Sequence, residues 1–403
     1  MYPPTMYPQF MPPPQYPHIR SKMNRAGAVI LIYWAVSMAV STLGVIIFMI
    51  IQAFQGVAQS AIRGDVLDPY ALAESLTSDM MSDSVFMAFL LLLSPLAAYL
   101  TALFGGLLTN VKMKPLLKPS RLRPSMLVVL TLIMLGIGCV CQYVIVFADY
   151  VLSHINISLY LPELLADMPT EPLAVCFYGL AICVGAPIAE ELLMRGVMLN
   201  ALRIYGNGFA VIVSALFFAL IHGNFVQGLG AFFLGLIFGI VTLQTGSLRP
   251  AIYLHAINNT TSFVLSYLFL AAKGNAFDAD LADGVVSLGL IVAAVVVAVI
   301  KWPEVKAFVN VMGVRPQAPQ YPQVSQYSQA PQYSQAPQYP QVSQYPQVPQ
   351  QPYVPQFPWL PVDVRFYWPR RWFCFWTSWS MLISLAVNTA ILFALVVLSA
   401  LGD

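Results

Sequence analysis

Long runs of apolar residues separated by short polar loops dominate this chain of 403 residues. A helix that crosses a membrane needs about 20 mostly apolar residues. Nine runs approach or exceed that length, at residues 27–53, 85–109, 125–150, 173–202, 208–222, 226–244, 250–271, 284–300 and 378–401. The run at 208–222 is short, and we expect it to cross only part of the membrane. The pattern predicts an all-α, polytopic integral membrane protein.

The composition agrees with this prediction. Hydrophobic residues make up 59% of the chain and charged residues only 9%, whereas about 25% of the residues in a soluble domain are charged. The lipid bilayer is therefore an expected partner. With 19 basic against 17 acidic residues, the chain lacks the positive charge of a nucleic-acid-binding protein. Its five cysteines form no CxxC pair, so neither a disulfide framework nor a cysteine metal site is predicted.

Basic and acidic loops alternate along the chain. Lys and Arg prevail at 20–25, 112–123 and 301–315, and Asp and Glu prevail at 65–83, 163–171 and 278–283. Loops rich in Lys and Arg stay on the cytoplasmic side. We therefore expect a multi-pass protein with a cytoplasmic N-terminus and an external C-terminus. Its compact loops are typical of a bacterial protein, so we expect it in a bacterial plasma membrane.

Two Pro-rich segments divide the chain. We expect a disordered Pro/Tyr-rich tail at 1–26, a transmembrane core at 27–302, a disordered Pro/Gln/Tyr-rich linker at 303–377 and a C-terminal transmembrane helix at 378–403. Pro-rich segments of this kind form extended chains without a packed core. A tether for the last helix and a multivalent interaction segment both fit the composition, which identifies no partner.

Polar side chains within the apolar runs mark the candidate site, because such groups are costly in lipid. Glu190 and Glu191 are adjacent, and Arg195 lies four residues after Glu191, on the same helix face. Glu190 points about 100° away from Glu191, since a helix has 3.6 residues per turn. A structural ion pair would need only one of these carboxylates. His222 and His255 lie in two later apolar runs.

Further along, Asn259 follows His255 by four residues and shares its helix face. Side chains from facing helices build sites inside bundles. We therefore expect the glutamates, the two histidines and Asn259 to converge on one polar chamber.

Three motifs in this region resemble those of the CAAX protease and bacteriocin-processing (CPBP, or Abi) family of intramembrane proteases. EELLMR is similar to its EExxxR motif, FALIH to its FxxxH motif and HAINN to its HxxxN motif. The resemblance covers residues 170–272. It implies an eight-helix transmembrane core, to which the span at 378–401 is an addition, and an endopeptidase that hydrolyses peptide bonds within the membrane.

The expected roles combine this resemblance with the residues. Glu190 is the expected general base, with His222 orienting the water. His255 and Asn259 would stabilise the oxyanion, and Glu191 and Arg195 would fix the helix. Zn²⁺ is a possible cofactor, with Glu190, His222 and His255 as its ligands.

The expected substrates are membrane-associated proteins or peptides, in CAAX-type processing or in bacteriocin and peptide maturation or immunity. Buried Glu, His and Arg side chains are also typical of a transporter or proton-coupled carrier, although the two halves of the chain show no internal repeat. A third alternative is a catalytically silent scaffold whose tails bind partners.

Overall fold

A computed structural model describes residues 17–63, 70, 80, 82–120, 122–159, 168–272, 279–313, 372 and 374–401. Within these residues every regular element is a helix and no strand occurs. The first half contains α1 (Pro17–Arg63), α3 (Ser84–Thr109), η1 (Lys114–Leu117), α4 (Pro124–Ser153), α5 (Pro172–Gly179), η2 (Leu180–Gly185), α6 (Ala186–Glu191) and η3 (Leu192–Met198). The second half contains α7 (Leu199–Leu202), η4 (Arg203–Tyr205), α8 (Asn207–Leu220), α9 (Phe225–Thr245), α10 (Arg249–Ala272), α11 (Ala279–Ile300), α12 (Trp302–Val309), η5 (Asn310–Gly313) and α14 (Trp379–Leu401).

The helices confirm an all-α, multi-pass membrane architecture. Six helical stretches are long and apolar enough to cross a membrane, at Ser21–Arg63, Ser84–Thr109, Pro124–Ser153, Pro172–Tyr205, Phe225–Thr245 and Leu281–Ile300. Each of the other three predicted runs also contains a helix: α8 and α14 are shorter apolar helices, and α10 falls outside the six. The count of eight core spans plus one therefore stays a prediction.

Helical structure extends beyond two predicted boundaries. α1 begins at Pro17, inside the segment expected to be a disordered tail. Proline suits the first turn of a helix, where its missing N–H would have no partner. α12 and η5 lie inside the predicted linker; there Phe308 is buried and Pro303 stands in the first turn of α12. The rest of both segments, 1–16 and 314–371, lies outside the described residues.

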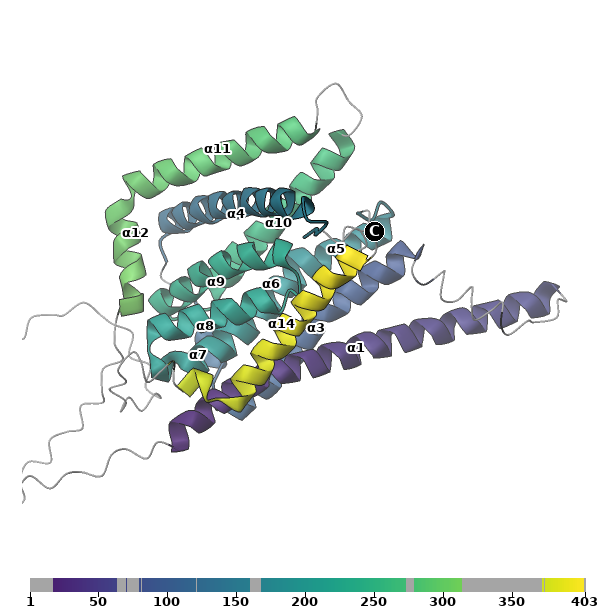
Figure 1. Cartoon of the computed structure of the whole chain (residues 1–403), viewed down its shortest axis with the longest axis horizontal. Helices are drawn as coiled ribbons and strands as arrows, with labels where there is room; N and C mark the ends of the chain where they lie inside the picture. The colour runs from purple at the N-terminus through teal and green to yellow at the C-terminus, as the bar shows by residue number, and fades with distance from the viewer. Residues whose placement is uncertain are drawn as a thin grey trace, which may run out of the picture.

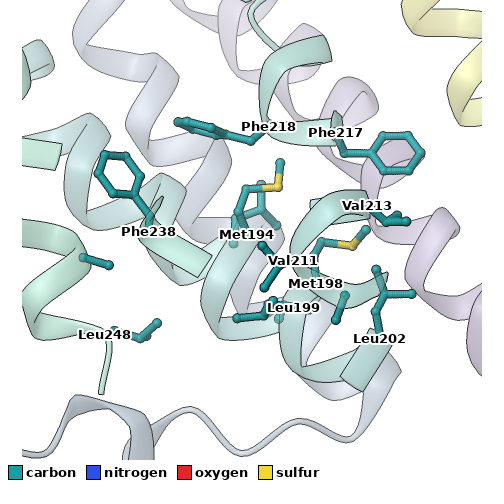
Figure 2. Packing of buried hydrophobic residues seen from close by; sticks show 14 of the residues in the cluster. Met194, Met198, Leu199, Leu202, Val211, Val213, Phe217, Phe218, Phe238 and Leu248 are labelled. Carbon is teal, nitrogen blue, oxygen red and sulfur yellow. The ribbon is translucent and has the colours of Figure 1, made fainter. Parts of the chain in front are cut away.

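α8 and α9 form an antiparallel pair at the centre of the bundle (Figure 1). A Cβ on Gly239 would meet Val211, and a Cβ on Gly235 would meet Ala215, so the two helices approach closely along their length. Figure 2 shows the core beside this pair, where Met194 of η3, Phe218 of α8 and Phe238 of α9 are close-packed. This core supports one side of the candidate site.

The basic loop after α3 packs against the beginning of α10. Leu248 donates its main-chain N–H to the Leu116 carbonyl at 2.8 Å, and the Ser247 hydroxyl donates to the Lys118 carbonyl at 2.7 Å. The connection that leads into α10 and the basic segment at 112–123 therefore share one end of the bundle, as the alternation of charge predicts.

Candidate active site

The paired glutamates lie on a long helix that changes its hydrogen-bonding pattern twice. Between Pro172 and Tyr205 the chain runs through α5, η2, α6, η3, α7 and η4 without a break. η2 and η3 are π-helical, so α6, which carries both glutamates, stands between two π segments. Such segments are rare and often occur at functional sites.

Glu191 holds two partners through a single oxygen. Its Oε1 accepts a hydrogen bond from Arg195 Nη1 at 2.7 Å and lies 3.1 Å from His255 Nδ1. The Glu191 and Arg195 side chains are fully buried, and that of His255 is only 6% exposed. The predicted Glu191–Arg195 pair is therefore present, and it also contacts His255 from a helix 64 positions away in the sequence.

Two aromatic rings flank the Arg195 guanidinium. Its Cζ lies 4.4 Å from the centroid of Phe218 and 5.2 Å from that of Phe238. Nη2 also donates to the Gly235 carbonyl at 3.1 Å. Cation–π contacts and a charge-assisted hydrogen bond compensate part of the cost of burying this charge. The surroundings thus hold Arg195 in one position.

The same rings position the His255 imidazole. It stacks on the Phe238 ring with the two centroids 5.2 Å apart. It also packs nearly perpendicular to the Phe218 ring, at a centroid distance of 5.7 Å. A carboxylate only accepts hydrogen bonds, so the imidazole Nδ1 donates to Glu191. Nε2 is thereby directed toward Glu190, whose Oε2 is 3.9 Å away. The Glu190 side chain is 19% exposed, so Glu190 is more accessible than the fully buried Glu191.

Asn259 serves as an anchor within the protein. Its Nδ2 donates to the Ile182 carbonyl in η2 at 2.9 Å. The Ala186 N–H bonds to the Ala181 carbonyl instead, and the next residue, Pro187, has no N–H to offer. The carbonyl of Ile182 therefore lacks its expected main-chain donor. Asn259 satisfies it and ties α10 to the π segment before the glutamates.

His222 stands apart from the glutamates. Its Nδ1 bonds to the Phe218 carbonyl at 2.7 Å, and its ring contacts the Phe218 ring at a centroid distance of 5.0 Å. In the part of the chain that the structure describes, no hydrogen bond or ion pair joins His222 to Glu190, Glu191 or His255. Phe218 touches both imidazoles and so lies between them.

The donor set predicted for zinc does not fit this arrangement. Over the described ranges, no three His, Cys, Asp or Glu side chains are grouped closely enough to hold a metal ion. Glu190 and His255 face one another, but His222 is directed to a main-chain carbonyl.

Three contributors were not found by sequence reasoning. Phe238, Gly235 and Ile182 hold Arg195, His255 or Asn259. Phe238 and Ile182 resemble any other apolar residue of a membrane helix, and Gly235 and Ile182 act through their main-chain carbonyls. Gly235 alone gave a signal, since a glycine in a helix interior often marks a close approach.

The candidate site falls within a segment that matches a family model. Residues 172–261 match the family model described as type II CAAX prenyl endopeptidase Rce1-like. No curated protein and no solved structure matches the chain. The matched segment runs from the first residue of α5 into α10 and contains both glutamates, Arg195, both histidines and Asn259. Over this segment, the match confirms the resemblance of the chain to the CPBP family.

Proposed function

We propose that the protein is an intramembrane endopeptidase that hydrolyses peptide bonds of membrane-associated proteins or peptides, with CAAX-type processing as one such reaction. One observation carries the mechanism: His255 lies between the two glutamates. Its Nδ1 is 3.1 Å from Glu191 and its Nε2 is 3.9 Å from Glu190. A histidine oriented by one carboxylate and facing a second one is suited to general acid–base chemistry.

The attacking water is proposed to bind between Glu190 and His255. A separation of 3.9 Å is too long for a direct hydrogen bond, and it allows one water molecule to hydrogen-bond to both groups. With Nδ1–H donated to Glu191, Nε2 of a neutral imidazole is an acceptor. The water would then donate one hydrogen to Nε2 and the other to Glu190, which leaves its lone pairs for attack.

Proton transfer accompanies each bond change. The water oxygen attacks the peptide carbonyl carbon while Glu190 takes a proton from the water. Glu190 then gives this proton to the leaving amine nitrogen as the C–N bond breaks. Arg195 and Glu191 touch neither reacting atom in this scheme and act as positioning residues for His255.

The oxyanion is proposed to be stabilised from α10. The Asn259 amide has two N–H groups, and one of them donates to Ile182. The second is the proposed donor to the tetrahedral oxyanion, one helical turn from His255. His222 is proposed to bind water or substrate through its Nε2, from the other side of Phe218. Its Nδ1 is not available, because it is already bonded to the Phe218 carbonyl.

Replacement of the base tests the proposal. Glu190→Gln keeps the shape of the side chain and removes its charge, so cleavage of a membrane peptide library by reconstituted protein should fall by about 10²–10⁴-fold. Glu304→Gln is the matched control, since Glu304 lies on α12, is exposed and pairs with Lys301 rather than with a residue of the site. If Glu190→Gln cleaves as fast as this control, Glu190 is not the base.

A further inference from the structure

Tyr33 of α1 lies beside the candidate site but outside the segment 172–261 that matches the family. It is 9% exposed and belongs to the core cluster that also contains Ala189, the residue before Glu190. A buried tyrosine usually finds a hydrogen-bond partner for its hydroxyl, because burying an unpaired O–H group is costly. The surroundings of this hydroxyl therefore indicate what Tyr33 does.

Side-chain contacts set the register of α1 against α3. Phe48 of α1 stacks on Phe86, near the start of α3, with the two centroids 3.8 Å apart. A Cβ on Gly105, near the end of α3, would lie 3.0 Å from Val29 of α1. Residue numbers fall on one helix as they rise on the other, so α1 and α3, which pack along one another (Figure 1), are antiparallel.

The long helix that carries the glutamates follows α3 in the same direction. A Cβ on Gly185 of η2 would lie 2.9 Å from Pro95 of α3, and a Cβ on Gly105 of α3 would lie 3.2 Å from Val197 of η3. Residue numbers rise together in these two contacts, so the long helix is parallel to α3. It is therefore antiparallel to α1.

This register places Glu190 at the depth of the turn from Tyr33 to Ser37. Val29 and Val197 lie at one depth, because both contact the same glycine of α3. From there, in one direction along the bundle, Tyr33 and Ser37 lie about 6 and 12 Å away, and Glu190 lies about 10 Å away, at 1.5 Å per residue. The hydroxyls of this turn of α1 are thus at the right level to act on the Glu190 carboxylate.

Two serine hydroxyls and the Glu190 charge surround the Tyr33 hydroxyl. Ser37 of α1 and Ser94 of α3 lie next to it, and Glu190 interacts with it electrostatically. Within the described residues this interaction with Glu190 is without a direct hydrogen bond. Catalytic hydrogen bonds are often long before the substrate binds, and one water molecule can complete them.

Ser37 departs from the usual behaviour of a hydroxyl in a membrane helix. Such a hydroxyl can donate to the carbonyl four residues earlier, as Thr101 of α3 does at 2.8 Å and Thr131 of α4 at 2.9 Å. The buried Ser37 Oγ, by contrast, has no partner of strict hydrogen-bond geometry among the described residues. Its contact with Tyr33 is therefore longer or more bent than an ideal hydrogen bond, and its hydroxyl stays available to Tyr33 or to a water beside it.

We propose that Tyr33 is a positioning residue for the base: its O–H donates to Glu190, directly or through one water, at the carboxylate oxygen that does not face His255. A hydroxyl donates one hydrogen bond and has lone pairs to accept others, so Ser37 and Ser94 can donate to Tyr33 while its own hydrogen goes to Glu190. Two helices, α1 and α10, would then hold the carboxylate. The inference rests on the proposed function for its effect on cleavage.

The first test removes the hydroxyl and keeps the ring. Tyr33→Phe should lower kcat about 10–100-fold, the factor that a hydrogen bond to a charged group contributes. KM should stay within about twofold, because the lost interaction concerns the base and not the binding of substrate. Tyr99→Phe is the matched control, since Tyr99 lies on α3 and is 43% exposed. If folded Tyr33→Phe protein cleaves as fast as this control, the proposal is wrong.

The second test separates positioning from a merely structural role. In the Glu190→Gln background, Tyr33→Phe should change the residual cleavage by less than about twofold, because the group that Tyr33 positions is already gone. A structural contribution of Tyr33 would lower cleavage by the same factor in both backgrounds. Equal factors therefore contradict the proposal.

The third test measures the contact without cleavage. Denaturant titration of the four proteins of a Tyr33→Phe and Glu190→Gln cycle should show coupling of about fivefold in the unfolding equilibrium constant, the difference between a hydrogen bond to a charged and to a neutral acceptor. The same cycle with Tyr99→Phe should be additive.

The outcomes of this cycle distinguish the two proposals. Additive losses at Tyr33 and Glu190 overturn the contact, whether or not the protein proves to be a protease. Coupling in a chain that cleaves no membrane peptide would support the contact and refute the proposed function instead.

Discussion

Neutralising Glu191 alone should destabilise the protein strongly. Glu191→Gln leaves the Arg195 guanidinium charged at a position with no exposed surface, where its Nη1 is 2.7 Å from Glu191 Oε1. Breaking a buried ion pair by removing one partner costs about 3–5 kcal/mol. The contacts of Arg195 with Phe218, Phe238 and the Gly235 carbonyl remain, so we expect the lower end of that range, about 3 kcal/mol.

The second substitution relieves this penalty. Arg195→Met in the Glu191→Gln background removes the uncompensated charge and keeps an apolar side chain between the two aromatic rings. The double variant should therefore lose less than the sum of the two single variants, with a coupling free energy of about 2 kcal/mol or more. Denaturant titration of the free energy of unfolding in mixed micelles, for the four proteins of a double-mutant cycle, measures this coupling.

The chain contains a matched control for this cycle. Lys301 and Glu304 form an ion pair at 2.9 Å with side chains 42% and 54% exposed. An exposed pair contributes less than about 1 kcal/mol, so its cycle should show little coupling at nearly the same distance. Additive losses at Glu191 and Arg195, within about 0.5 kcal/mol, would show that burial does not amplify the interaction and would refute the reasoning.

Two further predictions concern Asn259 and the topology. Asn259→Leu should lower the free energy of unfolding by about 1–3 kcal/mol, because it leaves the Ile182 carbonyl without its donor; unchanged stability with lost cleavage would show that Asn259 acts on the substrate alone. In a cysteine-free chain, an impermeant thiol reagent should label Glu171→Cys in intact cells and Lys118→Cys only after permeabilisation, as the basic loop is expected inside; labelling of both positions in intact cells would contradict this topology.

Local spacing was sufficient to predict part of the site. The spacing of four residues from Glu191 to Arg195 places both on one helix face, and the structure shows the ion pair. The positions of the helices could be predicted too, because about 20 apolar residues have few alternatives to a helix in a membrane.

The sequence analysis expects polar side chains of distant helices to converge, but it could not predict which of them meet. His255 joins both glutamates, yet every face of a membrane helix is apolar, so the sequence does not show which face meets another helix. The π segments were missed for the same reason: uniform apolar residues fit the α and π patterns equally. The position of His222, across Phe218 from His255, also depends on packing alone.

The two π segments give the helix of the paired glutamates places where its length can change without a change in its direction. A π turn bonds residues five apart, one more than an α turn. The segments η2, before α6, and η3, after it, therefore each contain one residue more than an α turn would. Deleting a single residue from η2 would turn it into an α turn and leave the direction of Glu190 relative to α5 nearly unchanged, whereas the same deletion from α5 would rotate Glu190 by about 100°. Swapped or shortened versions of this helix can therefore lose one residue between Pro172 and Glu190 only within η2, where the loss does not turn the motif.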